Sequence, residues 1–242
     1  ILWRNNSTGR VIVWYMDGTT STGTAVVWAA SAVGDALWVP IATGDFNADS
    51  KIDIIWRNSA TGRVIVWIMD GATRTSTTTL WNPATTADTL WVPYATGDFN
   101  ADSKIDIIWR NSSTGRVIVW YMNGTTRTST ANLWTPASAA DTLWVPVATG
   151  DFNADSKTDI VWRNSSTGRG IIWMMNGVTR TSTTTVWAAS GPTDYLWVPM
   201  ATGDFDASGA PDLVWRNSST GRVIAWMLTG TTTSTTAVLW SP

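Results

Sequence analysis

The sequence has no histidine, no cysteine and no glutamate among its 242 residues. Without histidine or cysteine, the chain cannot form a Ser-His-Asp or Cys-His nucleophile system, and it cannot ligate zinc, haem or an iron–sulfur cluster through those side chains. Any bound metal is therefore expected to be a hard cation held by oxygen atoms. Because no disulfide can form, the fold must be stabilised by packing and by any metal that binds.

The net charge is small, and long apolar runs are absent from the sequence. The formal net charge is −2, and no basic run offers an electrostatic footprint for nucleic acid or for an anionic membrane surface. No apolar stretch approaches the ~20 residues of a membrane-spanning helix. Residues 1–3 read as part of a strand with no signal peptide before them, which fits either a mature product or a fragment of something longer.

Tryptophan, in contrast, is abundant: the chain has 19. The triplet Trp-Arg-Asn recurs at a constant step of 53 residues, and three other tryptophan positions recur at the same step. The four series are Trp3, Trp56, Trp109, Trp162 and Trp215; Trp14, Trp67, Trp120, Trp173 and Trp226; Trp28, Trp81, Trp134, Trp187 and Trp240; and Trp38, Trp91, Trp144 and Trp197. The chain is therefore a tandem array of one unit without insertions or deletions.

One unit resolves into four short segments rich in Val, Ile, Thr and Trp, which predict strands over residues 37–43, 54–57, 63–69 and 77–81. Residues 58–62 and Asp70-Gly71 supply turn signals between them. Four strands in a repeat of this length are typical of a β-propeller blade. A β-solenoid or a row of independent β-domains is the alternative, but solenoid coils are usually shorter, and so small a unit would bury its own core poorly.

The expected fold is an all-β propeller of four-stranded antiparallel blades in a single domain, with blades near residues 1–29, 37–82, 90–135, 143–188 and 196–241. The first blade lacks its first strand and the acidic loop that follows that strand in the other units. We expect five blades because the chain supplies almost five. A larger ring with more copies, or two chains that complete each other, would also fit the count.

An acidic loop separates the first and second strands of each complete unit. In three loops the pattern is Asp-x-Asn-x-Asp-Ser-Lys-x-Asp, which places oxygen-bearing side chains at positions 1, 3, 5 and 9 and a backbone carbonyl at position 7. This spacing is related to that of EF-hand loops and predicts a structural Ca²⁺ site. The expected ligands are Asp45, Asn47, Asp49, Lys51 and Asp53; Asp98, Asn100, Asp102, Lys104 and Asp106; Asp151, Asn153, Asp155, Lys157 and Asp159; and Asp204, Asp206, Ser208, Ala210 and Asp212.

Two departures weaken this metal prediction. Ser50, Ser103 and Ser156 stand where such loops usually have glycine, and serine tolerates a positive φ less well. In the fourth loop Ser208 replaces the third acidic ligand, although Gly209 restores the glycine. We expect weaker or partial cation occupancy there, and an Asx-rich turn without metal is the alternative for all four loops.

The repeated motifs Asp-Phe-Asn-x-Asp-x-Lys-x-Asp-Ile-x-Trp-Arg-Asn and Thr-Gly-Arg-Val-x-x-Trp-x-Met-x-Gly resemble the FG-GAP/VCBS repeat family over essentially the whole chain. More closely, they are similar to the propeller lectins of the Psathyrella velutina type and their bacterial relatives. The resemblance implies Ca²⁺ in the acidic loops, monosaccharide pockets between blades, and an extracellular role in adhesion. The family lectins have seven blades, so this chain departs from them in ring size.

Antiparallel strand order places the turns after the second strands and the links after the fourth strands on the face opposite the acidic loops. Tryptophan rings on which sugars can stack and Arg and Asn side chains that bind hydroxyl groups gather there. The expected carbohydrate-binding residues are Trp28, Trp38, Arg57, Asn58, Trp81, Trp91, Arg110, Asn111, Trp134, Trp144, Arg163, Asn164, Trp187, Trp197, Arg216 and Asn217. A tryptophan at a fixed blade position is, however, more often inter-blade core. Arg74, Arg127 and Arg180 are expected to be solvated charges on the outer edge.

Three functions fit these patterns to different degrees. The leading hypothesis is a secreted, lectin-like propeller with repeated weak sugar sites, whose partners are glycans or glycoconjugates. The alternative is a structural or adhesion module that contacts surface proteins or identical chains, since repeated faces permit repeated contacts. An enzyme is the least supported, because nearly all Asp residues are repeated and no unique pair of carboxylates stands out.

Overall fold

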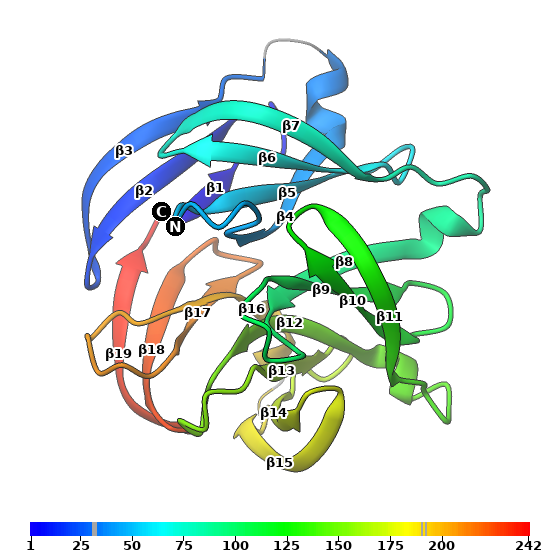
Figure 1. The fold of residues 1–242 in the computed structure, drawn as a ribbon. Helices are drawn as coiled ribbons and strands as arrows, with labels where there is room; N and C mark the ends of the chain where they lie inside the picture. Colours follow the sequence, from blue (N-terminus) through cyan, green and yellow to red (C-terminus); the bar gives the residue numbers. More distant parts are fainter. Residues whose placement is uncertain (31–32, 190, 192) are drawn as a thin grey trace.

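The computed structural model describes residues 1–30, 33–189, 191 and 193–242, and within them nineteen strands form five antiparallel sheets around a central axis (Figure 1). Blade one contains β1 (Leu2–Arg4), β2 (Val11–Asp17) and β3 (Thr20–Trp28). Blade two contains β4 (Trp38–Gly44), β5 (Asp53–Asn58), β6 (Val64–Asp70) and β7 (Thr73–Trp81), and blade three contains β8 (Trp91–Gly97), β9 (Asp106–Asn111), β10 (Val117–Asn123) and β11 (Thr126–Trp134). Blade four contains β12 (Trp144–Gly150), β13 (Asp159–Asn164), β14 (Gly170–Asn176) and β15 (Thr179–Trp187), and blade five contains β16 (Trp197–Gly203), β17 (Asp212–Asn217), β18 (Val223–Thr229) and β19 (Thr232–Trp240). The predicted all-β propeller of five blades, with a three-stranded first blade, is confirmed.

The first strand of each complete blade lies innermost, next to the first strands of the neighbouring blades (Figure 1). A series of hydrogen bonds joins these inner strands. The hydroxyl of Thr96 donates to the carbonyl of Thr43 at 2.5 Å, that of Thr149 donates to the carbonyl of Thr96 at 2.5 Å, and that of Thr202 donates to the carbonyl of Thr149 at 2.7 Å. One threonine per repeat therefore fixes the register between adjacent blades.

The observed strands differ from the predicted ones mainly at the fourth strand, which begins at Thr73 and not at Thr77. Its first residues are polar and exposed, so they carry no hydrophobic alternation, but the tight turn at Gly71 delivers them directly into pairing with β6. Short 3-10 turns also precede the inner strands: η1 (Val33–Leu37), η2 (Asp88–Leu90), η3 (Asp141–Leu143) and η4 (Asp194–Leu196).

The core lies between blades, where tryptophans from adjacent sheets meet. Trp56 is completely buried, and its ring centroid lies 4.4 Å from that of Trp67 in the same blade. Trp28 of the preceding blade packs edge-on against Trp56 at 5.1 Å. The same contact recurs one repeat later, where Trp81 lies 5.0 Å from Trp109. Trp56 and Trp67, which is only 6% exposed, are therefore inter-blade core, as are their equivalents in the other four-stranded blades.

The ring closes between blades five and one. The ring centroids of Trp3 and Trp240 lie 6.4 Å apart. A Cβ atom added to Gly18 would lie 3.1 Å from the carbonyl oxygen of Phe205, which is the spacing that Gly124 shows to Phe46 across an ordinary blade boundary. The two chain ends lie side by side at this boundary (Figure 1).

Equivalent tryptophans should contribute unequally to stability. Trp109→Ala removes a completely buried ring from a four-stranded blade and should lower the free energy of unfolding by about 3–5 kcal/mol. Trp3→Ala, at the same repeat position in the three-stranded blade, removes a half-buried ring and should lower it by roughly half as much. Urea unfolding of the two variants measures the difference. Equal losses would contradict the unequal burial.

Candidate functional site

Each acidic loop is folded around the side chains of its own Asp and Asn residues. In the first loop the carboxylate of Asp45 accepts hydrogen bonds from the backbone N–H groups of Asp49 at 3.2 Å and Ser50 at 2.8 Å. The side-chain oxygen of Asn47 accepts from the N–H of Asp49, and Asp49 in turn accepts from the N–H of Lys51 at 2.9 Å. Side chains at positions 1, 3 and 5 thus point into the turn, as a cation loop requires.

The serine at the expected glycine position adopts the left-handed conformation. The φ angle is 66° at Ser50 and 63° at both Ser103 and Ser156, and it is 82° at Gly209 in the fourth loop. The backbone path is therefore the same in all four loops, although three of them carry serine at this position, for which the conformation is unfavourable by about 1 kcal/mol or more. The hydrogen bonds to Asp45 and its equivalents hold the serines there.

The last aspartate of each loop anchors the loop to the blade. Asp53 is fully buried, and its carboxylate accepts hydrogen bonds from the N–H of Phe46 within the loop and from the N–H of Met69 on β6, both at 2.9 Å. Burial raises the pKa of Asp53, Asp106 and Asp159, although these hydrogen bonds act in the opposite direction. A carboxyl group with a raised pKa opposes folding increasingly as the pH rises from 3.8, the ordinary value, through the folded value. A cation nearby would offset that effect.

The fourth loop brings three carboxylates together. Ligand oxygens of Asp204, Asp206 and Asp212 lie within 4.8 Å of one another, and among the described residues no other group of three acidic side chains meets this limit. The difference arises at position 3, where the fourth loop has Asp206 and the other loops have Asn. The loop in which the sequence predicts the weakest binding is therefore the one with the most concentrated charge, and its relative occupancy stays a prediction.

Lys51 shows how the predicted position-7 ligand is placed. Its ammonium group forms a 3.0 Å ion pair with Asp70 at the end of β6, so the side chain points away from the aspartates of its own loop. The side chain of Lys157, by contrast, lies 3.8 Å from Asp155. An ammonium group cannot ligate a cation, so any role of position 7 depends on its backbone carbonyl and stays a prediction.

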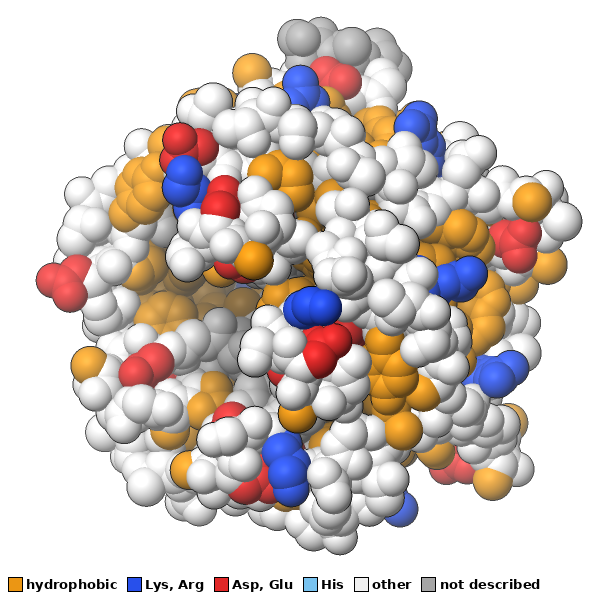
Figure 2. All heavy atoms as spheres, viewed as in Figure 1, with side chains coloured by type: hydrophobic (Ala, Val, Ile, Leu, Met, Phe, Trp, Pro, Cys, Tyr) orange, Lys and Arg blue, Asp and Glu red, His pale blue; other side chains and the backbone are white. Residues whose placement is uncertain are grey.

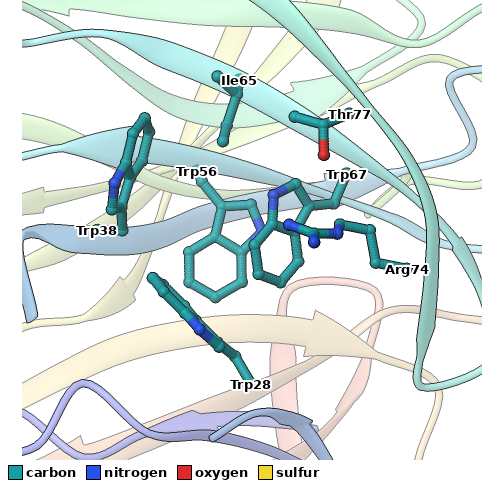
Figure 3. Close-up of a pocket in the computed structure, with 7 residues that line it drawn as sticks. All are labelled: Trp28, Trp38, Trp56, Ile65, Trp67, Arg74 and Thr77. Carbon is teal, nitrogen blue, oxygen red and sulfur yellow. The ribbon is translucent and has the colours of Figure 1, made fainter. Parts of the chain in front are cut away.

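Pockets lined by tryptophan lie between blades. The first has a volume of about 190 Å³ and is lined by Trp28 of blade one and by Trp38, Trp56, Ile65, Trp67, Arg74 and Thr77 of blade two. Figure 3 shows Trp38 to the left of the central Trp56–Trp67 pair, Arg74 to its right and Trp28 below it. The next boundary repeats the arrangement in a pocket of about 300 Å³ lined by Trp81, Asp88, Trp91, Trp109, Ile118, Trp120, Arg127 and Thr130.

The arginine of each of these pockets stacks on a tryptophan. The guanidinium carbon of Arg74 lies 4.6 Å from the ring centroid of Trp67, Arg127 lies 4.5 Å from Trp120, and Arg180 takes the same position over its own tryptophan. These arginines are exposed on the outermost strands, as the sequence predicts, but they also form one wall of the pockets. The sequence did not suggest this cation–π contact.

The boundary between blades four and five differs from the three boundaries that precede it along the chain. Blade five has Thr233 at the position of Arg74, so no guanidinium covers Trp226. There Trp187 turns to stack on Trp226, with an interplanar angle of 29°, whereas Trp81 meets Trp120 at 74°. A tryptophan from the preceding blade thus takes the ring face that arginine covers elsewhere.

The predicted Arg and Asn ligands form hydrogen bonds to the backbone. Arg110 is 5% exposed, and its guanidinium donates to the carbonyls of Trp144, at 3.2 Å, and Thr142. The side-chain oxygen of Asn111 accepts from two N–H groups of its own turn. Asn58, Arg163, Asn164 and Asn217 form equivalent contacts. Arg57 donates only to the carbonyl of Thr89, and Arg216 has no such partner among the described residues. A role of any of these residues in binding sugar stays a prediction.

A family model described as FG-GAP-like repeat matches residues 45–109, 98–162 and 151–215. Each match begins at the acidic loop of one blade and ends in the second strand of the next, so together they cover most of the chain. No curated protein matches the chain. Within the described part of the chain, no helix is long and apolar enough to span a membrane.

The anchoring role of the last loop aspartate can be tested at Asp106. Asp106→Asn replaces one acceptor oxygen with an NH₂ group, so one of the buried N–H groups of Phe99 and Met122 loses its partner. The free energy of unfolding should fall by about 1–3 kcal/mol in buffer that contains a chelator. Asp102→Asn, at an exposed position with the same change of charge, is the matched control and should change it by less than about 0.5 kcal/mol. Similar losses in both variants would count against a specific anchor.

Proposed function

Because the chain belongs to the FG-GAP-like repeat family, we propose that it is a secreted calcium-loop propeller that binds carbohydrate in the tryptophan pockets between its blades. The observation that carries the proposal is the placement of Trp91. This half-buried side chain packs beside the core cluster and lines the pocket between blades two and three, yet among the described residues its ring takes no part in the ring–ring contacts of that boundary. Trp38 is placed in the same way in the preceding pocket.

The chemistry of the pocket suits a sugar ring. A pyranose presents an apolar face, which stacks on an aromatic ring, and a rim of hydroxyl groups, which need fixed donors and acceptors. Trp91 supplies the ring, Arg127 supplies donors, and Asp88 and Thr130 supply acceptors around the same cavity. Volumes of about 190 and 300 Å³ lie at or below the lower end of ordinary ligand pockets, so one sugar unit fits better than an oligosaccharide.

The proposal is a binding function and not a catalytic one. Asp88 is the acidic residue in the lining of the second pocket, and its carboxylate accepts hydrogen bonds from Ala84 and Thr85, which lower its pKa. An ionised, hydrogen-bonded carboxylate is suited to fix a hydroxyl group. Small repeated sites would each bind weakly, and several of them on one ring would gain avidity on a glycan surface.

Removing the pocket tryptophans that take no part in the ring–ring contacts tests the proposed sugar sites. The triple variant Trp38→Ala, Trp91→Ala and Trp144→Ala removes the stacking ring from three equivalent boundaries. If the wild type binds a monosaccharide with a Kd of about 1 mM, this variant should lose at least tenfold in affinity, in line with the ~1.4 kcal/mol that one such contact provides. A panel of monosaccharides, titrated by tryptophan fluorescence and by NMR in the presence of Ca²⁺, measures the effect.

The matched control is Trp197→Ala at the boundary between blades four and five, where Thr233 replaces the arginine and Trp187 already stacks on Trp226. It should leave sugar affinity unchanged. If neither the monosaccharide panel nor a glycan array gives a signal with the wild type, the carbohydrate proposal is wrong.

We further infer that Ca²⁺ is the ion that the acidic loops hold. The donors are carboxylate and amide oxygens with a backbone carbonyl at position 7, which suits a hard cation, and the irregular loop suits Ca²⁺ better than the stricter octahedron of Mg²⁺. In the fourth loop Asp204, Asp206 and Asp212 converge without any Lys or Arg in the loop to offset their charge. Ca²⁺ would supply positive charge there and hold the loop against its blade.

Calcium should therefore stabilise the fold. At a hundredfold excess over Kd, each site that binds only the folded state adds about 2.7 kcal/mol. The midpoint of thermal unfolding should rise with Ca²⁺, rise less with Mg²⁺, and fall again with a chelator. Asp204→Asn, at the position that is Asp in all four loops, should remove one site in calcium titrations, whereas Asp17→Asn, an exposed aspartate outside the loops, should remove none. An unfolding midpoint that does not respond to Ca²⁺ would refute the inference.

An adhesion module that contacts protein is the second candidate, and one observation favours it. Leu37, Leu90 and Leu143 are 41%, 38% and 38% exposed at the same position in consecutive blades, just before the inner strand. A repeated apolar side chain on one face suits a repeated protein contact. Retained self-association or protein binding without any sugar signal would favour this function.

A further inference from the structure

Among the residues that the structure describes, no strand pairs with the inner edge of β1 in blade one. In the other four blades an inner strand pairs with the strand equivalent to β1, whereas β1 itself pairs with β2 alone among the described residues. We propose that this edge is a docking site for one occupant, an extended segment with the repeat's own inner-strand and loop sequence, as in residues 37–53. This goes beyond the binding of sugar, because the ligand is a polypeptide and the site is the blade itself.

Burial identifies the edge as an interface that lacks its cover. Trp3 and Leu2 are half-buried, whereas their equivalents Trp56 and Ile55 are fully buried beneath β4. Met16 on β2 is also half-buried, and its equivalent Met69 is 1% exposed. Figure 2 shows the surface hollowed left of centre, with hydrophobic side chains at the base, beside the chain ends marked in Figure 1.

The series of threonine hydrogen bonds between the inner strands does not close around the ring within the described part of the chain. The hydroxyl of Thr43 donates no hydrogen bond among the described residues, and the carbonyl of Thr202 accepts none from a further inner strand. A threonine in an inner strand placed between β16 and β4 would donate to Thr202 and accept from Thr43. The open series therefore specifies threonine at that point of the occupant.

Arg216 provides a second, independent sign. Arg4, Arg110 and Arg163 each donate to two backbone carbonyls at the start of the next inner strand, for example Arg4 to Trp38 at 3.1 Å. Arg216 makes no such hydrogen bond among the described residues and is half-buried at the boundary with blade one. Its guanidinium is thus available to the carbonyls that would precede the occupant's Val-Pro.

The space that the occupant's acidic loop would fill is open beside the turn at Gly71. A Cβ atom added to Gly124 or Gly177 would meet the carbonyl of the loop phenylalanine of the preceding blade at 3.1 or 3.2 Å. Around Gly71, the equivalent turn of blade two, the space within 4 Å is open. The N–H of Met16 likewise lacks the buried carboxylate that Asp53 offers to Met69. Strand and loop together fill these gaps.

The register of the occupant follows from the complete blades. In blade two, Val39, Pro40 and Ala42 lie opposite Arg57, Trp56 and Ile55, with the irregularity of the strand between Pro40 and Ala42. The same residues of the occupant should therefore lie opposite Arg4, Trp3 and Leu2.

A synthetic peptide of residues 37–53 is the probe. Added to the 242-residue chain, it should bind one to one, slow hydrogen exchange of the backbone amides of residues 1–5 at least tenfold, and raise the midpoint of thermal unfolding. A peptide of the same composition in scrambled order should have none of these three effects. Absence of binding, or binding without protection of residues 1–5, would overturn the proposal.

A chain extended after Pro242 by a copy of residues 84–106 is the matched control, because that extension carries the link, the inner strand and the loop in their repeat order. It should fill the edge from within and lose at least tenfold in peptide affinity. Undiminished peptide binding by the extended chain would show that the peptide binds elsewhere. If the original chain forms a dimer that protects residues 1–5 without peptide, a second copy is the occupant, and the proposal is wrong. A sugar titration of the peptide complex distinguishes the two proposals, because the sugar pockets do not need the added strand.

Discussion

A blade of this protein can bury its middle strands only against the blade beside it. One 53-residue unit has too little volume to enclose the apolar faces of its second and third strands. The solution is the tryptophan contact across each boundary, in which Trp81 of one blade meets Trp109 and Trp120 of the next edge-on. Because each sheet covers its neighbour, the units are stable as a ring.

Polar groups set how accurately the blades align. Arg110 spans the boundary to the carbonyls of Trp144 and Thr142, and Thr149 bonds to Thr96 between inner strands. Arginine inside an interface is expensive to bury unless its donors are satisfied. Carbonyls at a fixed distance along the chain satisfy them, which gives a physical reason for a repeat without insertions: a one-residue slip in the link would leave a buried guanidinium unpaired.

The repeat, the strands, the five blades and the path of the acidic loops could be predicted from the sequence, because each depends on local pattern or on spacing. The environment of Arg74 could not. A register irregularity between Ile68 and Met69 pairs Arg74 with Met69 and brings its guanidinium over Trp67, and no sequence pattern reports such an irregularity. The early start of β7 was missed for a related reason, since a strand of exposed threonines has no apolar alternation.

The hydrogen bonds from the arginines of Trp-Arg-Asn to backbone carbonyls also could not be predicted from the sequence. The donors of Arg110 and the carbonyls that they reach belong to different blades and lie 32 and 34 residues apart. An arginine beside two tryptophans suggests a sugar site as readily as a structural tie. The distinction needs the burial of the guanidinium, which is a property of the assembled ring.

The same triplet can thus occupy unlike environments. Trp56 and Trp3 belong to the same sequence motif, yet one is fully buried and the other is half-buried, because only the first has an inner strand against its sheet. Because the units are nearly identical in sequence, the burial of a residue depends on which strands surround it in the ring and not on the sequence of its own unit. It follows that the chemistry which holds any inner strand in place is the same at every blade. A strand whose side chains fit beside β5 therefore also fits beside β1, because both edges offer the same contacts.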